Sequence, residues 1–242
     1  MKRLNFLKEK NYPRTLIQYS GIEAFDLKDY DGSLRISNLS HYGDFGLGSF
    51  NALDGELIYF DGNAYHATSD GRLKPADSES LLSCAYFTKF DSKTSVQLED
   101  LRLSFLFQKI KNSFSHPGQI FSALRINGFF NMIRLRSVPP QKKPYPAIEE
   151  VVKEQALYIY KNVSATVIGF YFPTYFNGLT YSGFHLHFIT NDLKHGGHVL
   201  DFELNQGEVF LSPLENYLYL LPDYALNLKE QDCTLSCSHQ GE

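Results

Sequence analysis

Short strand-like segments separated by turns dominate the hydrophobic pattern of the first third of the chain. Asp-Gly pairs stand at residues 31–32, 54–55, 61–62 and 70–71. Asp-Gly tolerates the positive φ angles of hairpin turns, and the segments 56–60 (ELIYF) and 64–68 (AYHAT) between these pairs have strand length. The pattern therefore predicts an antiparallel meander.

Two later segments have a helical pattern. Residues 98–112 place apolar side chains near helical spacing, with Glu and Asp in the first turn. Residues 145–158 have Pro146 at their second position, and proline suits a first helical turn. The segment Val138–Pro146 contains four prolines, and we interpret it as a connector between two halves of the chain.

The chain becomes strand-like again from residue 164, with candidate strands at 164–172, 180–190, 198–204 and 217–221. These patterns predict an α/β protein of the α+β type. We expect a mixed α/β N-terminal domain over residues 1–163. An antiparallel β domain with an irregular tail is expected over residues 164–242.

Composition and charge narrow the class of protein. The chain has 242 residues, 43% of them hydrophobic and 21% charged, which excludes a disordered chain. The net charge of −4 disfavours nucleic acid or an anionic membrane surface as the main partner. A charged N-terminus and the lack of a run of ~18 apolar residues argue against export and membrane insertion. Three cysteines cannot all pair within one chain, so a cytoplasmic location is expected.

The clearest local sign of chemistry is the segment 183–189 (GFHLHFI), in which apolar residues alternate with His185 and His187. Residues two apart on a strand point to the same side, so these two imidazoles converge. A turn-rich loop then returns the chain to His198, which is expected beside the pair. Simple alternation would place His198 on the same strand face as Leu200 and Phe202, so we expect a bulge near Gly196 and Gly197 to bring it to the pair.

Three neutral imidazoles with an open coordination position suit Zn²⁺ acting as a Lewis acid, although the spacing alone also admits Fe²⁺, Mn²⁺ or Ni²⁺. The alternative is a polar strand face with solvated histidines. His41, His66 and His116 are expected in loops or at the surface. A glycine-rich stretch at 43–48 matches neither a P-loop nor a dinucleotide fingerprint, so no nucleotide cofactor is predicted.

Several motifs together resemble the α-acetolactate decarboxylase family. They are 43–57 (GDFGLGSFNALDGEL), 136–138 (RSV), 143–145 (KPY), 183–189 (GFHLHFI) and 196–201 (GGHVLD). The resemblance extends from about residue 17 to residue 222. It implies a zinc-dependent lyase that converts 2-acetolactate to (R)-acetoin and CO₂. It also implies a metal site between a mixed α/β part and an antiparallel sheet.

The resemblance assigns roles to individual residues. The family's three zinc ligands fall on His185, His187 and His198. Its active-site glutamate falls on Glu56, and its active-site arginine falls on Arg136, where Ser137 replaces the family's Thr. On the residues alone, Glu56 would be an exposed strand-edge carboxylate and Arg136 a surface charge.

The C-terminal tail departs from the family pattern. The family brings a tail glutamate, typically followed by glycine, to the metal. Here the residue before Gly241 is Gln240, and Glu242 is the nearest glutamate. Glu242 is therefore the candidate tail carboxylate.

Two other functions remain open at this point. A cupin-like metal-dependent oxygenase also uses an HxH strand, but the sequence has no second cupin-type box. A non-catalytic metal-binding sandwich would leave Glu56 and Arg136 without a role. The expected partner of an enzyme of this kind is a small-molecule substrate, 2-acetolactate, and the sequence leaves monomer and homodimer both open.

Overall fold

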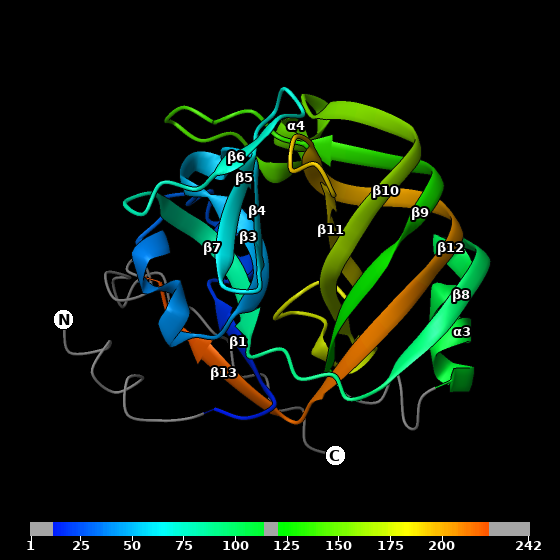
Figure 1. Cartoon of the computed structure of the whole chain (residues 1–242). Helices are drawn as coiled ribbons and strands as arrows, with labels where there is room; N and C mark the ends of the chain where they lie inside the picture. The colour runs from blue at the N-terminus through cyan, green and yellow to red at the C-terminus, as the bar shows by residue number, and fades with distance from the viewer. Residues whose placement is uncertain (1–11, 114–120, 223–242) are drawn as a thin grey trace, which may run out of the picture.

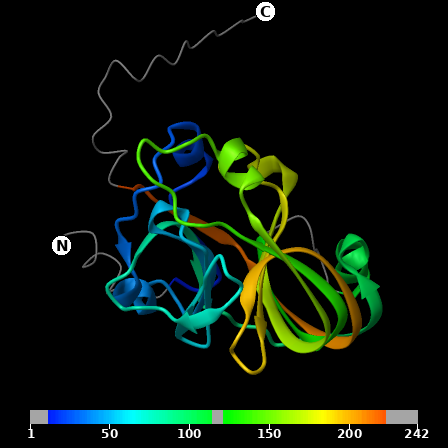
Figure 2. The same cartoon turned by 90° about the horizontal axis from the view of Figure 1, so that it is seen from above.

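Two β-sheets lie side by side in the computed structural model, which describes residues 12–113 and 121–222 (Figure 1). The first sheet, blue to cyan in Figure 1, is built mainly from the N-terminal part of the chain. The second contains longer, strongly curved strands, and the view from above shows it curling away from the first (Figure 2).

The first sheet has eight strands in the order β13-β1-β7-β3-β4-β5-β6, with β2 paired to β7. Its strands are β1 (Thr15–Tyr19), β2 (Leu34–Arg35), β3 (Phe45–Phe50), β4 (Glu56–Phe60), β5 (Asn63–Ala67), β6 (Leu73–Pro75), β7 (Leu81–Thr88) and β13 (Asn216–Leu220). All the pairings are antiparallel except that of β1 with β13, which is parallel. The predicted meander is therefore present as β3, β4, β5 and β6, and Asp61-Gly62 forms the turn between β4 and β5.

The second sheet has five strands in the order β11-β10-β9-β12-β8, and all its pairings are antiparallel. Its strands are β8 (Ser95–Arg102), β9 (Phe121–Ser137), β10 (Ala156–Phe172), β11 (Gly183–Thr190) and β12 (Gly196–Leu214). β11 also pairs with β12, so β9, β10, β11 and β12 form a closed ring of strands at one end.

The helices of the described residues are few and short, as expected for this α+β fold. They are the α-helices α2 (Ile22–Asp26), α3 (Leu103–Ser113) and α4 (Ile148–Lys153) and the 3-10 helices η1 (Ile36–His41), η2 (Asn51–Leu53) and η3 (Thr174–Phe176).

The core between the sheets is aromatic. Phe45 of the first sheet packs edge-on against Phe170 of the second, with ring centroids 5.8 Å apart. A separate core fills the curved second sheet, where Phe130 and Phe188 pack together with Leu106 of α3. Full burial of such a side chain contributes ~1.5–3 kcal/mol, so these contacts hold the sheets at the spacing that the site between them requires.

The helix predicted over residues 98–112 is correct only from residue 103 onward. β8 continues to Arg102, and α3 begins at Leu103. Leu98 and Leu101 both face the core, although they are three residues apart, because Asp100 has a φ of 45° and interrupts the strand alternation. This irregularity imitates helical spacing in the sequence.

The helix predicted over residues 145–158 is shorter than expected. α4 spans Ile148–Lys153, and β10 begins at Ala156. The alternation from Leu157 onward pairs with β9 and so favours a strand. The domain boundary predicted at residue 163 stays a prediction; residue 163 lies within β10, which pairs with β9 from the first half of the chain.

The expectation for His66 was wrong, because it is not at the surface. His66 lies in β5 and is only 6% exposed.

Over residues 12–113 and 121–222, none of the helices has the length and apolar character that crossing a membrane requires.

Candidate metal centre and active site

One register position of the second sheet brings three predicted site residues together. His187 of β11 pairs with His198 of β12, and His198 pairs on its other side with Arg136 of β9. Directly paired residues in a sheet present their side chains on the same face. The closed ring of strands therefore aligns two imidazoles and a guanidinium in one row.

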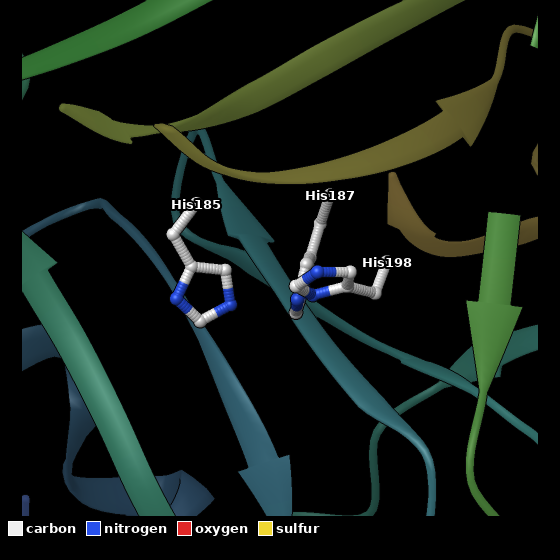
Figure 3. Close-up of side chains that lie close together, drawn as sticks. All are labelled: His185, His187 and His198. Atoms are coloured by element: carbon white, nitrogen blue, oxygen red, sulfur yellow. The ribbon is translucent and has the colours of Figure 1, made fainter. Parts of the chain in front are cut away.

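His185 joins this row because it lies two residues before His187 on β11. The three imidazole ring centroids are 5.0 to 5.4 Å apart. One nitrogen of each ring lies within 4.8 Å of the others. Figure 3 shows the three rings extending from β11 and β12 toward a common region beside the strands of the first sheet.

The predicted position of a bulge near Gly196 and Gly197 was wrong. Gly196, Gly197 and His198 pair with β11 in regular register. The irregularity comes afterwards, between Val199 and Asp201, where β12 shifts against β9. This shift allows His198 to face the other histidines while Val199 and Phe202 both enter the core.

The donor atoms fit a metal ion. His187 is fully buried, and its Nδ1–H donates to the carbonyl oxygen of Leu57 at 2.7 Å. This hydrogen bond fixes the tautomer with the lone pair on Nε2. Nε2 is buried and has no hydrogen-bond partner within the described ranges. An unpartnered buried nitrogen is costly unless it has a ligand, and metal coordination satisfies it.

Burial keeps these histidines neutral. It lowers the pKa of His187 to about 4, and it lowers the pKa values of His185 and His198 well below their usual range, with the neighbouring imidazoles and Arg136 adding to the effect. Only neutral imidazole coordinates a metal ion. The environment therefore prepares all three side chains as ligands at neutral pH.

Glu56 lies at the start of β4, in the first sheet, and is 6% exposed. Its Oε2 is 3.4 Å from Nε2 of His187. Because His187 is neutral, this contact is not an ion pair at neutral pH. Burial raises the pKa of Glu56 to about 7, although Arg136 and a hydrogen bond with Ser49 oppose the shift. The carboxyl group can therefore hold or release a proton near neutral pH.

Arg136 is half-buried in the same row as His198. Its Nη1 donates to Oε1 of Gln155 at 3.4 Å. Its Nε is buried and, among the residues that the structure describes, has no hydrogen-bond partner. A guanidinium with unused donors beside three neutral histidines is suited to binding an anionic group.

A cavity of about 640 Å³ joins these residues. Glu56, Arg136, His185 and His198 line it, and His187 lies behind them. Apolar side chains also line the cavity; they include Phe25, Leu53, Val138, Ile148, Val152 and Phe184. The cavity thus combines a few polar and titratable groups with a largely apolar lining, as small-molecule sites generally do.

Sequence reasoning singled out none of several further cavity residues. Ser49, Cys84, Tyr86 and Thr180 also line the cavity. The hydroxyls of Tyr86 and Thr180 are 2.6 Å apart, and burial raises the pKa of the Cys84 thiol to about 11. Ser49 lies within the 43–57 motif, whereas Cys84 and Tyr86 of β7 and Thr180 lie outside every motif quoted above, so only the pairing of the strands could identify these three.

The predicted tail residue cannot be placed. Gln240 and Glu242 lie outside the described residues. β13 ends at Leu220, and the carbonyl of Leu220 accepts a hydrogen bond from the N–H of Ser20. Gly21, which follows Ser20 in the chain, lines the cavity. The described chain therefore ends close to the cavity rim.

Comparison with known proteins gives a consistent result. The family model described as "Alpha-acetolactate decarboxylase" matches residues 16–232. The chain is 38% identical to the alpha-acetolactate decarboxylase of Methanosarcina mazei over 88% of this chain and 74% of that protein. It is 39% identical to the enzyme of Bacillus subtilis strain 168 over 81% of this chain and 77% of that protein.

The fold agrees with these sequence matches. The crystal structure of alpha-acetolactate decarboxylase from Bacillus subtilis strain 168 superposes with a TM-score of 0.83 at 36% identity, covering 86% of this chain and 89% of that one. The expected mixed sheet and antiparallel sheet are therefore confirmed. This agreement disfavours the cupin-like oxygenase and the non-catalytic sandwich. The chain belongs to the alpha-acetolactate decarboxylase family of carboxy-lyases.

Proposed function

We propose that this protein catalyses the zinc-dependent decarboxylation of 2-acetolactate to (R)-acetoin and CO₂. Its named relatives are alpha-acetolactate decarboxylases. The observation that carries the proposal is the unpartnered Nε2 of His187, which lies within a cluster of three histidines and beside Glu56.

His185, His187 and His198 would hold the zinc ion. When bound, zinc would supply Lewis-acid stabilisation of the negative charge that develops on the substrate oxygens. 2-Acetolactate is a β-keto acid, so loss of CO₂ leaves an enediolate whose charge must be stabilised.

Arg136 is proposed to orient the substrate. Its planar guanidinium can bind the substrate carboxylate, or the oxyanion that follows it, through two parallel hydrogen bonds. Arg136 pairs with His198 and lines the cavity beside it, which supports this role. The alkyl groups of the substrate would then contact the apolar residues that line the rest of the cavity.

Glu56 is proposed to supply the proton that completes acetoin. Its pKa of about 7 leaves much of the carboxyl protonated near neutral pH. Burial restrains Glu56, so it is proposed to approach the enediolate from one face only. Protonation from that face would give a single enantiomer.

The test is an anaerobic assay of the purified protein, loaded with zinc, with racemic 2-acetolactate. We expect oxygen-independent formation of acetoin with an excess of the R enantiomer. Prior removal of the metal with a chelator should abolish activity, and zinc should restore it. A fully zinc-loaded protein that forms no acetoin would contradict the proposal, and a requirement for oxygen would favour the oxygenase.

Arg136→Lys is expected to lower kcat/KM at least about tenfold, equivalent to ~1.4 kcal/mol, although the charge is kept. Lysine offers a point charge and cannot reproduce the two parallel hydrogen bonds. Steady-state kinetics would measure the loss. Arg134→Lys is the matched control, because Arg134 is an exposed arginine on the same strand. Equal kinetics of Arg136→Lys and wild type would exclude the orienting role.

The tail is proposed to contribute a carboxylate, with Glu242 as the candidate. Deletion of residues 237–242 is expected to lower turnover at least about tenfold, equivalent to ~1.4 kcal/mol of barrier, without loss of zinc. Gln240→Glu should maintain or raise activity, because it restores a carboxylate before Gly241. Unchanged turnover and enantiomeric excess after the deletion would show that the tail has no catalytic part.

A homodimer remains a prediction that size-exclusion chromatography with light scattering can check.

A further inference from the structure

The turn that precedes Glu56 has an unusual backbone. Ala52, Leu53 and Gly55 have φ angles of 59°, 56° and 68°. Glycine adopts this left-handed region freely, but alanine and leucine do so only when surrounding contacts hold them there. Glu56 follows directly, so the position of its carboxyl group depends on whatever holds this turn.

Backbone groups from two other segments hold part of the turn. The N–H of Ala52 donates to the carbonyl of Tyr30 at 2.8 Å, and the carbonyl of Ala52 accepts from the N–H of Gln141 at 2.8 Å. The N–H of Gly55 donates to the carbonyl of Val138 at 3.0 Å. None of these backbone hydrogen bonds involves the carbonyl of Asp54, which instead accepts from a side chain.

His66 supplies that side-chain contact. Its Nε2 lies 2.7 Å from the carbonyl oxygen of Asp54, so Nε2–H donates to this oxygen. The His66 ring stacks on Phe50 with centroids 4.0 Å apart. His66 pairs across β4 and β5 with Leu57, which is the residue after Glu56. The buried imidazole thus contacts the turn at Asp54 and the residue before it at Phe50, while the backbone of His66 pairs with the strand that follows the turn.

The close packing at Gly55 strengthens this contact. A Cβ at Gly55 would lie 3.0 Å from Nε2 of His66 and 2.2 Å from the carbonyl oxygen of Ala67. The backbone at Gly55 therefore approaches the imidazole and β5 directly. A small shift of the His66 ring would move the Asp54 carbonyl, and Glu56 is only two residues beyond it.

We infer that His66 is a positioning residue for Glu56, acting through its hydrogen bond to the carbonyl of the left-handed turn. The inference rests on the proposed catalytic role of Glu56. His66 does not line the cavity, so it acts on kcat through Glu56 and has no contact with substrate. A misplaced catalytic group costs rate even when substrate binding is unchanged.

Two substitutions separate the hydrogen bond from the ring. His66→Phe keeps a stacking ring and removes the donor, whereas His66→Gln keeps an N–H donor near the position of Nε2 and removes the ring. We expect His66→Phe to lower kcat at least about tenfold, with KM and zinc content unchanged. We expect His66→Gln to retain kcat within about threefold of wild type. If His66→Phe does not fold, His66→Leu serves as the variant without a donor.

Tyr59→Phe is the matched control. Tyr59 is a buried residue of β4, and its hydroxyl donates to the carbonyl of Gly43 at 2.9 Å, away from the turn. Its loss should lower the melting temperature without lowering kcat. Melting curves and steady-state kinetics would be measured on wild type, His66→Phe, His66→Gln and Tyr59→Phe. They would compare the loss of the His66 hydrogen bond with the loss of the Tyr59 hydrogen bond.

The decisive measurement repeats His66→Phe in a Glu56→Gln background. If His66 acts through Glu56, the second substitution should cause no further loss of kcat. Equal fold losses in both backgrounds would show a general structural role and overturn the inference. The inference would also be overturned if His66→Phe kept wild-type kcat, or if His66→Gln lost more kcat than His66→Phe. Failure of the proposed function would be visible first, as absence of acetoin from wild type or full activity of Glu56→Gln.

Discussion

Replacing His187 with alanine is expected to abolish zinc binding and to lower acetoin formation by at least roughly two orders of magnitude. His187 would be the central ligand of the proposed zinc site, because it pairs with His198 on the next strand and lies two residues from His185 on its own. Its Nε2 has no other partner among the residues described, and its Nδ1–H is already bonded to Leu57. No other side chain in the row can replace this nitrogen.

Metal analysis of the purified variant, together with kinetics, would measure this effect. His195→Ala is the matched control, because His195 belongs to the same hairpin but its Nδ1 bonds to the carbonyl of Gly71. His198→Ala should lose zinc as His187→Ala does, and since His198 is less buried it distinguishes ligand loss from a folding defect. Full zinc retention by a folded His187→Ala protein would refute the assignment of the metal centre.

Glu56→Gln is expected to keep the metal and to lower kcat by roughly two orders of magnitude, within the range typical of a lost general acid. The amide has the shape of the carboxyl group but offers no acidic proton. Its small size change should leave the packing around β4 intact. Turnover, zinc content and the enantiomeric excess of the acetoin would all be measured on the same preparation.

Two further substitutions sharpen this test. Glu149→Gln removes another carboxylate that lines the cavity, from α4, and should change kcat less than about threefold. Glu56→Asp keeps the acid but shortens its reach, so it should fall between wild type and Glu56→Gln. A Glu56→Gln enzyme with near wild-type kcat would mean that another group delivers the proton.

Local pattern was a good guide wherever one strand or turn decides the structure. The Asp-Gly turns predicted the meander, and the alternation around His185 and His187 predicted that both imidazoles share a face. The same reasoning failed at residues 98–102, because the irregularity at Asp100 places Leu98 and Leu101 on one face with helical spacing. A local pattern cannot distinguish an irregular strand from a helix when both bury the same residues.

The clustered histidines of the candidate site were predictable from the sequence, whereas the burial of the residues around them was not. Motifs identified His185, His187 and His198, and the resemblance to a family assigned Glu56 and Arg136. Neither indicated that Glu56 is buried with a pKa near 7, because burial depends on how the two sheets pack. The burial of His66 beneath the turn was also invisible, since a histidine in a short strand gives no sign of which neighbours will cover it.

The sequence by itself determined the class of fold, the two-histidine strand and the family to which the chain belongs. Only the tertiary structure decided that His187, His198 and Arg136 share one row, because that row depends on the register among β9, β11 and β12. Register is set by long-range hydrogen bonds and core packing, and a shift of one residue would turn each side chain to the opposite face. The first sheet then adds Glu56 and the Leu57 carbonyl, so the chemistry arises where two separately patterned sheets meet.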